Sequence, residues 1–413
     1  MSQVAPPTPD GQLADSVELL EGGLDYFAAL INAIDQAQTE VHLETYIFDF
    51  TGEGANVAQA LVRAALRGIA TRVLVDGVGT DPLPPVWQQR FEIAGVQWCV
   101  YAPLGRLGLL IPSRWRRLHR KLCVIDQRVA FCGGINILDD HHDPNHGPLV
   151  QPRLDFAVRA TGALVPQIHA TLSQLWWRIQ GVRRAVRSVR EHRFPQALKA
   201  LRSLPWPRRA TPAAASLSTG RAFLLLRDNL RHRSQIEKAY RQAIAHARSD
   251  ILIANAYFLP GRKLRRALIH AAQRGVKVQL LLQGRYEYFM QFHAARPVYG
   301  ALLAAGVEIY EYRASFLHAK VAVIDATSPR AWATVGSSNL DPLSLLLARE
   351  ANVVVQGRTF AIHLRERLLH AIRQGSEPMP ARSYLERPWQ QRVLDHVAYG
   401  LMRLALWVNG SRY

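Results

Sequence analysis

The feature that most constrains this chain is a short segment that occurs twice, once in each half of the sequence. The copies read LHRKLCVID and LHAKVAVID, and each keeps a histidine, a lysine and an aspartate at one spacing: His119, Lys121, Asp126 and His318, Lys320, Asp325. Because positions i and i+2 of a strand point to the same side, each histidine shares a face with its lysine. Two such strands brought together would surround one pocket with two imidazoles and two ammonium groups.

A longer duplication surrounds these segments, with its order preserved. The paired stretches are ALRGIATRVLVDG (65–77) with AQRGVKVQLLLQG (272–284), AGVQW (94–98) with AGVEI (305–309), FCGGIN (131–136) with TVGSSN (334–339), and DFAVRATG (155–162) with EANVVVQG (350–357). Helical and strand patterns alternate in both halves. The sequence therefore predicts an α/β protein of two duplicated halves, each a mixed β-sheet flanked by helices. We expect a pseudo-twofold axis to relate them and the active site to lie between them.

The repeat makes four further polar residues interpretable. Asn136 and Asn339 follow glycine turns, where they could donate hydrogen bonds to a phosphate or cap the turn. Asp155 and Glu350 begin equivalent strands, where a carboxylate could accept a hydrogen bond from the Nδ1 of a histidine and fix its tautomer. The alternative for both acids is an exposed surface position.

The paired histidines and lysines suit a phosphodiester substrate. The ammonium groups would neutralise phosphate oxygens, one imidazole would attack phosphorus, and the other would protonate the leaving alkoxide. This chemistry requires no metal and no cofactor. The histidine-rich stretch HHDPNH (141–146) lies in a polar loop of the first half only and has no partner at a known ligand spacing, so we do not expect it to bind a metal.

With its two HxKxxxxD segments the chain resembles the phospholipase D superfamily, whose signature is two HKD motifs. The LHRK and LHAK contexts, the segment LETYIF (43–48) and the length are similar to the B-type bacterial cardiolipin synthases. The resemblance implies that two phosphatidylglycerol molecules give cardiolipin and glycerol through a phosphohistidine. It implies His119 as nucleophile and His318 as general acid and base, with the HKD aspartates, Asp126 and Asp325, in the catalytic set. From the residues alone, we expect these aspartates, which end their apolar strands, to hold local turns and charges and not to contact substrate.

One difference between the copies concerns a hydroxyl. The first has Gly133 and Gly134 where the second has Gly336 and Ser337, so only the second site has a possible hydroxyl donor to substrate phosphate or histidine. We therefore expect unequal roles for the two halves. Glu44, in the LETYIF segment, could serve the site or act as a structural carboxylate at the domain interface. Asp76 aligns with Gln283 and is therefore not part of a duplicated acid pair.

The charge of the chain points to a polyanionic partner. Its 51 basic and 32 acidic residues give a formal net charge of +19, which suits an anionic bilayer, a nucleic acid, or a solvated surface. Basic residues alternate with apolar ones at helical spacing over 178–209, and a second apolar stripe begins at Trp389. Because the aromatic residues sit on amphipathic stripes, we predict contact with phospholipid and not with nucleic acid. Packing against the protein core is the alternative for the second stripe.

The organisation predicted from the repeat has four parts: a first half over 16–178, a basic linker over 179–215, a second half over 216–375 and an amphipathic tail over 376–413. Both motifs lie in one chain, so an oligomer is not required for catalysis. The N-terminal sequence lacks the pattern of a signal peptide, and three sparse cysteines suggest buried thiols in a reducing compartment. We expect a peripheral protein on the cytoplasmic side of the inner membrane.

Three functions remain possible from these residues. The first is a cardiolipin-forming phosphatidyltransferase. The second is a phosphodiesterase of the same superfamily, either a lipid hydrolase or a nuclease, that uses the same paired site. The third is a catalytically silent binding protein, and the intact histidine and lysine in both copies count against it.

Overall fold

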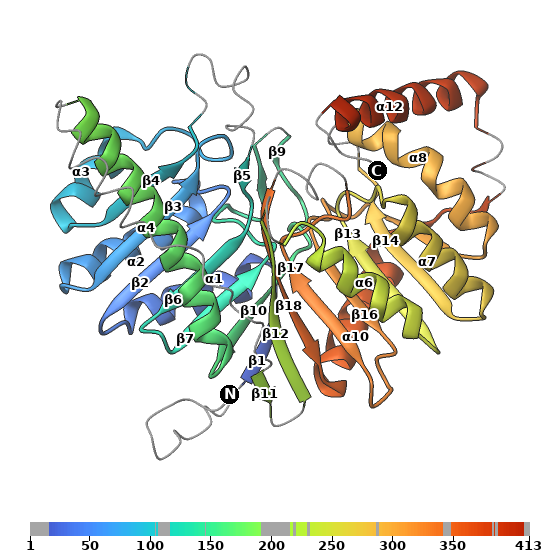
Figure 1. The fold of residues 1–413 in the computed structure, drawn as a ribbon, viewed down its shortest axis with the longest axis horizontal. Helices are drawn as coiled ribbons and strands as arrows, with labels where there is room; N and C mark the ends of the chain where they lie inside the picture. Colours follow the sequence, from blue (N-terminus) through green and yellow to red (C-terminus); the bar gives the residue numbers. More distant parts are fainter. Residues whose placement is uncertain are drawn as a thin grey trace.

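The structure, a computed structural model, shows two α/β halves side by side, each with a central sheet (Figure 1). It describes residues 16–103, 105, 116–144, 146–190, 215–217, 220–228, 232–285, 289–341, 348–381, 384 and 387–408. The expected class, two duplicated α/β halves with mixed sheets flanked by helices, is confirmed.

The first sheet contains seven strands, which pair in antiparallel fashion on one side of the sheet and in parallel on the other. Their order is β1 (Ser16–Glu21), β10 (Phe156–Thr161), β7 (Val129–Gly133), β6 (Lys121–Ile125), β2 (Glu40–Thr45), β3 (Ala70–Asp76) and β4 (Gln97–Tyr101). The pairs β2·β3 and β3·β4 are parallel, and the other pairs are antiparallel.

The second sheet repeats this arrangement strand by strand. Its equivalent strands are β12 (Gly220–Arg227), β18 (Ala348–Gln356), β17 (Trp332–Gly336), β16 (Lys320–Ile324), β13 (Asp250–Asn255), β14 (Lys277–Gln283) and β15 (Glu308–Tyr312). Only β13·β14 and β14·β15 of these pairs are parallel. Three more strands join this sheet: β11 (Ala215–Leu217) and β19 (Ser376–Pro378) at its edges, and β5 (Arg117–Leu118) on β18. The same order and directions in both sheets reproduce the duplication read from the sequence.

Three large hydrophobic cores and one small one stabilise the described part of the molecule. Helices cover the outer face of each sheet: α1 (Gly22–Asp35), α2 (Gly52–Leu66) and α3 (Pro85–Ala94) in the first half, and α6 (Gln235–His246), α7 (Arg262–Gln273) and α8 (Phe289–Ala304) in the second. The third core joins β6, β7 and β10 to β16, β17 and β18, with α10 (Arg358–Gly375) and the start of α4 (Leu164–Arg190). Strands β6 and β16 are buried on both faces, which explains their unbroken apolar runs.

The segments outside the two sheets only partly follow the predicted divisions. Helix α4 continues through residue 178, where the linker was expected to begin, and most of that linker lies outside the described residues. The tail contributes β19 to the second sheet and then α12 (Trp389–Val408), which packs on α8. None of the described helices is long and apolar enough to cross a membrane. The three cysteines are free and buried, as expected.

Candidate active site

Each of the two motif histidines is anchored by the backbone of the opposite half. The His119 amide donates a 3.1 Å hydrogen bond to the Arg349 carbonyl, and the His318 amide donates a 2.9 Å bond to the Leu154 carbonyl. Parallel pairing of β5 with β18, and a parallel bridge between Leu154 and Leu317, extend both contacts. The two connections are equivalent under the pseudo-twofold relation, so the histidines meet where the halves meet.

The carboxylates at the starts of the equivalent strands bond to these histidines crosswise. The Nδ1 of His119 lies 3.0 and 3.1 Å from the two carboxylate oxygens of Glu350, and the Nδ1 of His318 lies 2.6 Å from Oδ2 of Asp155. Both acids are almost completely buried, whereas the histidine side chains are 16% and 18% exposed. Each acid thus fixes the Nδ1 side of a histidine in the other half and leaves the Nε2 on the opposite side of the ring for chemistry.

The two lysines complete the same site. The Lys121 ammonium donates to the His119 carbonyl at 2.8 Å and to the His119 Nε2 at 3.2 Å, and the Lys320 ammonium donates to the His318 carbonyl. Both lysine side chains are buried within the protein. The bond to Nε2 requires a lone pair on that nitrogen, which is the form of imidazole that can act as a nucleophile or base.

Electrostatics at the site favour neutral imidazoles. Burial lowers the pKa of His119, and the ammonium groups of Lys121 and Lys320 lower it further against the opposing effect of Glu350. Burial and the same two lysines hold the pKa of His318 well below its usual value. Both lysines lower the pKa of both histidines, so the four side chains act as one electrostatically coupled cluster.

Burial also changes the proton affinity of two neighbours. It lowers the pKa of Lys121 to about 7, with repulsion from Lys320 acting in the same direction. It raises the pKa of Asp155 to about 7, although the nearby lysines oppose this. Burial thus raises the proton affinity of Asp155 and lowers that of His318, its hydrogen-bond partner.

A polar side chain holds the backbone just before each histidine, a role that the sequence reading missed. Asp76, at the end of β3, accepts from the Leu118 amide at 2.7 Å. Gln283, at the end of β14, accepts from the Leu317 amide at 3.2 Å. These two residues align in the repeat, and comparing their hydrogen-bonding capacity, not only their charge, would have identified them.

Tyr46 is a second residue of the site that the sequence reading did not single out. Its ring centroid lies 4.9 Å from that of His119, and the Lys121 ammonium lies 5.6 Å from the ring centroid. Tyr46 follows β2 within the LETYIF segment, whose position in the resemblance was the available signal. The ring forms one apolar wall beside the first histidine.

The two asparagines lie in equivalent turns but differ in their contacts. Asn136 accepts a 3.2 Å hydrogen bond from the Ile47 amide and so ties the turn to the end of β2. Asn339 is 2% exposed, and its Oδ1 has no hydrogen-bond partner among the described residues. The described contacts give Asn136 a turn-holding role, one of the two expected from the sequence.

The difference between Gly134 and Ser337 changes how each carboxylate is held. Ser337 donates its hydroxyl to Glu350, so the second half supplies the pair with a hydroxyl. In the first half a Cβ at Gly134 would lie 2.3 Å from Oδ1 of Asp155, which leaves no space for a side chain. That oxygen accepts from the Phe156 amide at 2.8 Å instead. The hydroxyl thus bonds to the carboxylate that holds His119, and not directly to a histidine as one of the expectations had it.

Glu44 forms a buried ion pair that exists in the first half only. Arg120, between the motif histidine and lysine, donates from Nε and Nη2 to Glu44, the latter at 3.1 Å, and also to the Thr171 carbonyl of α4. Both side chains are at most 6% exposed. The equivalent positions of the second half are both alanine, Ala254 and Ala319. This pair fastens the strand of the first motif to α4, so Glu44 has a structural role.

Replacing Arg120 with methionine is expected to lower the free energy of unfolding by about 3–5 kcal/mol, because it leaves the Glu44 carboxylate buried without a counter-charge. Adding Glu44→Gln should recover part of that loss, since the unpaired charge is then gone. Urea unfolding of the single and double variants measures both values. An unchanged midpoint for Arg120→Met would contradict a structural role for the pair.

The motif aspartates lie at the far ends of their strands from the histidines. β6 separates Lys121 from Asp126 by about 16 Å at roughly 3.3 Å per residue, and β16 does the same in the second half. Asp126 accepts from the backbone amides of residues 38–40, and Asp325 accepts from those of residues 248–250. Both aspartates adopt positive φ, 52° and 49°. This placement is the turn-holding alternative and gives neither carboxylate a contact with the paired histidines.

The histidine-rich loop of the first half is separate from this cluster. Its residues form the small hairpin of β8 (His142–Asp143) and β9 (Gly147–Pro148), and His146 pairs with Asp143 at 3.0 Å. Within the described ranges, no group of three or more His, Cys, Asp or Glu side chains is arranged to hold a metal ion.

Comparison with known proteins gives a consistent result for both halves. Residues 30–150 and 240–372 match the family described as "Cardiolipin synthase, PLD-like domain". Cardiolipin synthase B of Escherichia coli strain K12 is 36% identical over 391 residues, which span 94% of this chain and 88% of that protein. Cardiolipin synthase B of Salmonella typhi is 37% identical over 398 residues, with the same coverage.

A solved structure shares the fold at much lower sequence identity. Phosphatidylserine synthase of Haemophilus influenzae Rd KW20 superposes with a TM-score of 0.63 at 11% identity, covering 94% of this chain and 93% of that one. At this identity the likeness concerns the fold alone.

Proposed function

The chain belongs to the family of cardiolipin synthases with phospholipase D-like domains, and we propose that it transfers a phosphatidyl group from one phosphatidylglycerol to another. The products are cardiolipin and glycerol. The observation that carries the proposal is the crosswise arrangement of two imidazoles, each oriented by a buried carboxylate, with two ammonium groups. This set provides a nucleophile, an acid and neutralisation of phosphate charge in one site.

In the first step His119 is the nucleophile. Its Nε2 attacks the phosphorus of a bound phosphatidylglycerol, and the bond from phosphorus to the glycerol oxygen breaks. His318 gives its proton to that oxygen, so glycerol leaves as a neutral alcohol and a phosphohistidine remains. Lys121 turns from the His119 Nε2 to a phosphate oxygen and, with Lys320, stabilises the negative charge of the transition state.

In the second step a primary hydroxyl of another phosphatidylglycerol replaces glycerol. His318 takes the proton of that hydroxyl, the oxygen attacks phosphorus, and the bond from phosphorus to His119 breaks. Cardiolipin forms and both histidines return to their starting states. If water took the place of this hydroxyl, the product would be phosphatidic acid.

The unequal partners of the histidines support this assignment of roles. Burial raises the pKa of Asp155 to about 7, so the pair that it forms with His318 binds a proton more tightly than an ordinary carboxylate does. That proton is what a general acid must supply. The Nε2 of His119 accepts a hydrogen bond from Lys121 and therefore carries the lone pair that a nucleophile needs.

The proposed reaction uses no metal ion, because the two ammonium groups supply the positive charge and an imidazole supplies the nucleophile. We also propose a peripheral position on the cytoplasmic leaflet of the inner membrane. The formal net charge of +19 suits an anionic leaflet, and the three free, buried thiols suit a reducing compartment.

The rate constant kcat/KM is expected to fall as pH rises above about 7. The pKa of Lys121 is lowered to about 7, so its ammonium is charged below that pH and neutral above it. Since kcat/KM reports the free enzyme, this loss of charge weakens capture of the anionic substrate. Lys121→Arg should make the falling limb shallower, because guanidinium stays charged and only the proton held by Asp155 and His318 is then lost. An alkaline limb of the same steepness in both proteins would exclude Lys121 as a contributor.

The test of the function is to incubate the purified protein with phosphatidylglycerol vesicles in the presence of a chelator and to identify products by mass spectrometry. Cardiolipin and glycerol in equal amounts are expected. Phosphatidic acid alone would assign the hydrolase alternative. Activity that is lost with chelator and regained only with one divalent ion would contradict the metal-free reaction.

A further inference from the structure

Helix α12 differs from an ordinary surface helix because it buries an acidic side chain and exposes large apolar ones. Its acidic residue Asp395 is 2% exposed and accepts hydrogen bonds of 2.7 Å from His293 and from Arg387. Ala398, on the same face, is also 2% exposed. A helix on a soluble protein normally turns its apolar stripe inward and its charges outward. In α12 a buried ionic network fixes the polar face against the protein instead.

The outward face of α12 carries large apolar side chains. They are Trp389 at 69% exposure, Val393, Val397 and Leu401 at 52% each, and Leu394 at 39%. Four of them recur every four residues, so they lie in one continuous stripe. Contiguous exposed apolar surface of this kind marks an interaction site.

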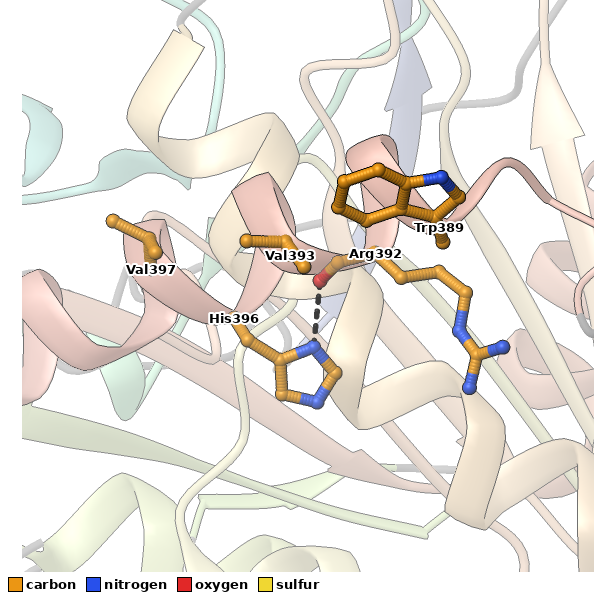
Figure 2. A pocket seen from close by; sticks show the side chains of 5 residues that line it. All are labelled: Trp389, Arg392, Val393, His396 and Val397. Carbon is orange, nitrogen blue, oxygen red and sulfur yellow. Dashed lines mark hydrogen bonds between the residues drawn. The ribbon is translucent and has the colours of Figure 1, made fainter.

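Basic groups accompany the stripe. A shallow open pocket is lined by Trp389, Val393 and Val397 together with Arg392 and His396 (Figure 2). The His396 Nδ1 donates to the backbone carbonyl of Arg392 at 2.7 Å, and the arginine side chain extends beside the indole of Trp389. Between residues 389 and 401 the one acidic residue is Asp395, which is buried. The exposed surface therefore combines apolar and positive groups and suits an anionic partner.

Helix α12 lies in the upper half of the view in Figure 1, as does β5, the strand that leads directly into His119. The substrates proposed above are lipids of an anionic bilayer, so a surface that binds that bilayer would bring the site to its substrate.

We propose that the outward stripe of α12 is a bilayer-docking surface, with its apolar side chains at the level of the lipid headgroups and Arg392 on anionic phosphates. Interfacial helices use this combination of a tryptophan, aliphatic residues and basic groups. The choice of a bilayer as occupant rests on the proposed function, while the docking itself can be measured without turnover. A second copy of the chain is the competing occupant.

The test compares two pairs of matched substitutions in the full-length protein. Val393→Ser/Val397→Ser removes two aliphatic side chains from the stripe. Leu66→Ser/Ile93→Ser removes two aliphatic side chains that are more exposed, 64% and 74%, at the ends of α2 and α3, which precede the starting edges of β3 and β4. Binding to vesicles of phosphatidylcholine with and without phosphatidylglycerol is measured by flotation. Circular dichroism and thermal unfolding check that each protein is folded.

The stripe variant should bind vesicles containing phosphatidylglycerol about ten- to a hundredfold more weakly than the unaltered protein, and the control pair should bind normally. Cardiolipin formation from substrate dispersed in detergent should be unchanged in both. Equal vesicle binding by all three proteins would overturn the proposal. Loss of a dimer in sedimentation, with vesicle binding retained, would assign the stripe to a second copy.

A second measurement does not depend on the serine variants. Brominated lipids should quench tryptophan fluorescence in the unaltered protein, and Trp389→Phe should lose a clear part of that quenching while binding vesicles normally. Identical quenching in both proteins would place Trp389 outside the bilayer and overturn the proposal. Normal docking without any cardiolipin product would instead count against the proposed function alone.

Discussion

Turnover of phosphatidylglycerol is expected to fall by about 10⁴-fold or more when either His119 or His318 is replaced with alanine. The reason is geometric: the two imidazoles share one site, and each performs a step that the other cannot perform at the same time. The measurement is the initial rate of cardiolipin formation for the two variants, with unfolding midpoints to show that both are folded. Substantial activity in either variant would contradict a shared site.

The same variants can separate the two roles if the substrate is a phosphatidyl ester of nitrophenol. Nitrophenolate leaves without needing a proton, so His318→Ala should release a burst of it and keep a phosphohistidine on His119. His119→Ala should release none. The reverse pattern would make His318 the nucleophile and exchange the roles given above.

The second large effect is expected at the buried carboxylates. Glu350→Gln and Asp155→Asn should each lower kcat by about 10³- to 10⁴-fold, because an amide can present its NH₂ group to Nδ1 and so favour the wrong tautomer. Each change acts on a histidine of the opposite half. Steady-state kinetics with cardiolipin as product measures the loss. Normal kcat in both variants would show that the carboxylates do not orient the histidines.

Three substitutions serve as controls for the carboxylates. Asp126→Asn and Asp325→Asn remove acids of the motif that hold turns, so they should lower stability and leave kcat of the folded protein nearly unchanged. Ser337→Ala removes a hydroxyl that touches Glu350 and should lower kcat by about tenfold or less, roughly the value of one hydrogen bond.

The folding stability of the two aspartate variants should also depend on pH differently from that of the unaltered protein. Burial raises the pKa of each, but the hydrogen bonds from backbone amides and from Thr39 or Ser249 outweigh it, and both pKa values are lowered. A lowered pKa in the folded state stabilises the protein above the unfolded pKa, and that stability is lost as pH falls through the folded value. The asparagine variants should therefore approach the stability of the unaltered protein in acid.

Much of the fold could be read from local patterns. The glycine turns at residues 68 and 275, and the apolar runs after them, identify equivalent strands in the two halves, and the structure confirms their common order. The end of the first half was harder to predict from the sequence, since α4 crosses the expected boundary at residue 178. Helical periodicity does not reveal where a helix passes from one core to the next.

Part of the candidate site could be predicted from the sequence. The spacing of each histidine and lysine follows from strand geometry, and the alignment of Asp155 with Glu350 indicated a pair of orienting acids. Asp76 and Gln283 were missed because they differ in charge while both accept a hydrogen bond from the residue before a motif histidine. Tyr46 was missed because its contact with His119 depends on how β2 ends beside the first motif.

The sequence by itself determined the repeated architecture, the two reactive segments and the basic, lipid-suited character of the chain, because these are properties of spacing and composition. The tertiary structure alone decided which acid serves which histidine. The partners lie 231 and 163 residues apart, so their pairing is set by how the two sheets pack and not by any local signal. Packing also decided that α12 buries its aspartate and exposes its apolar stripe, since the same stripe would equally suit a core.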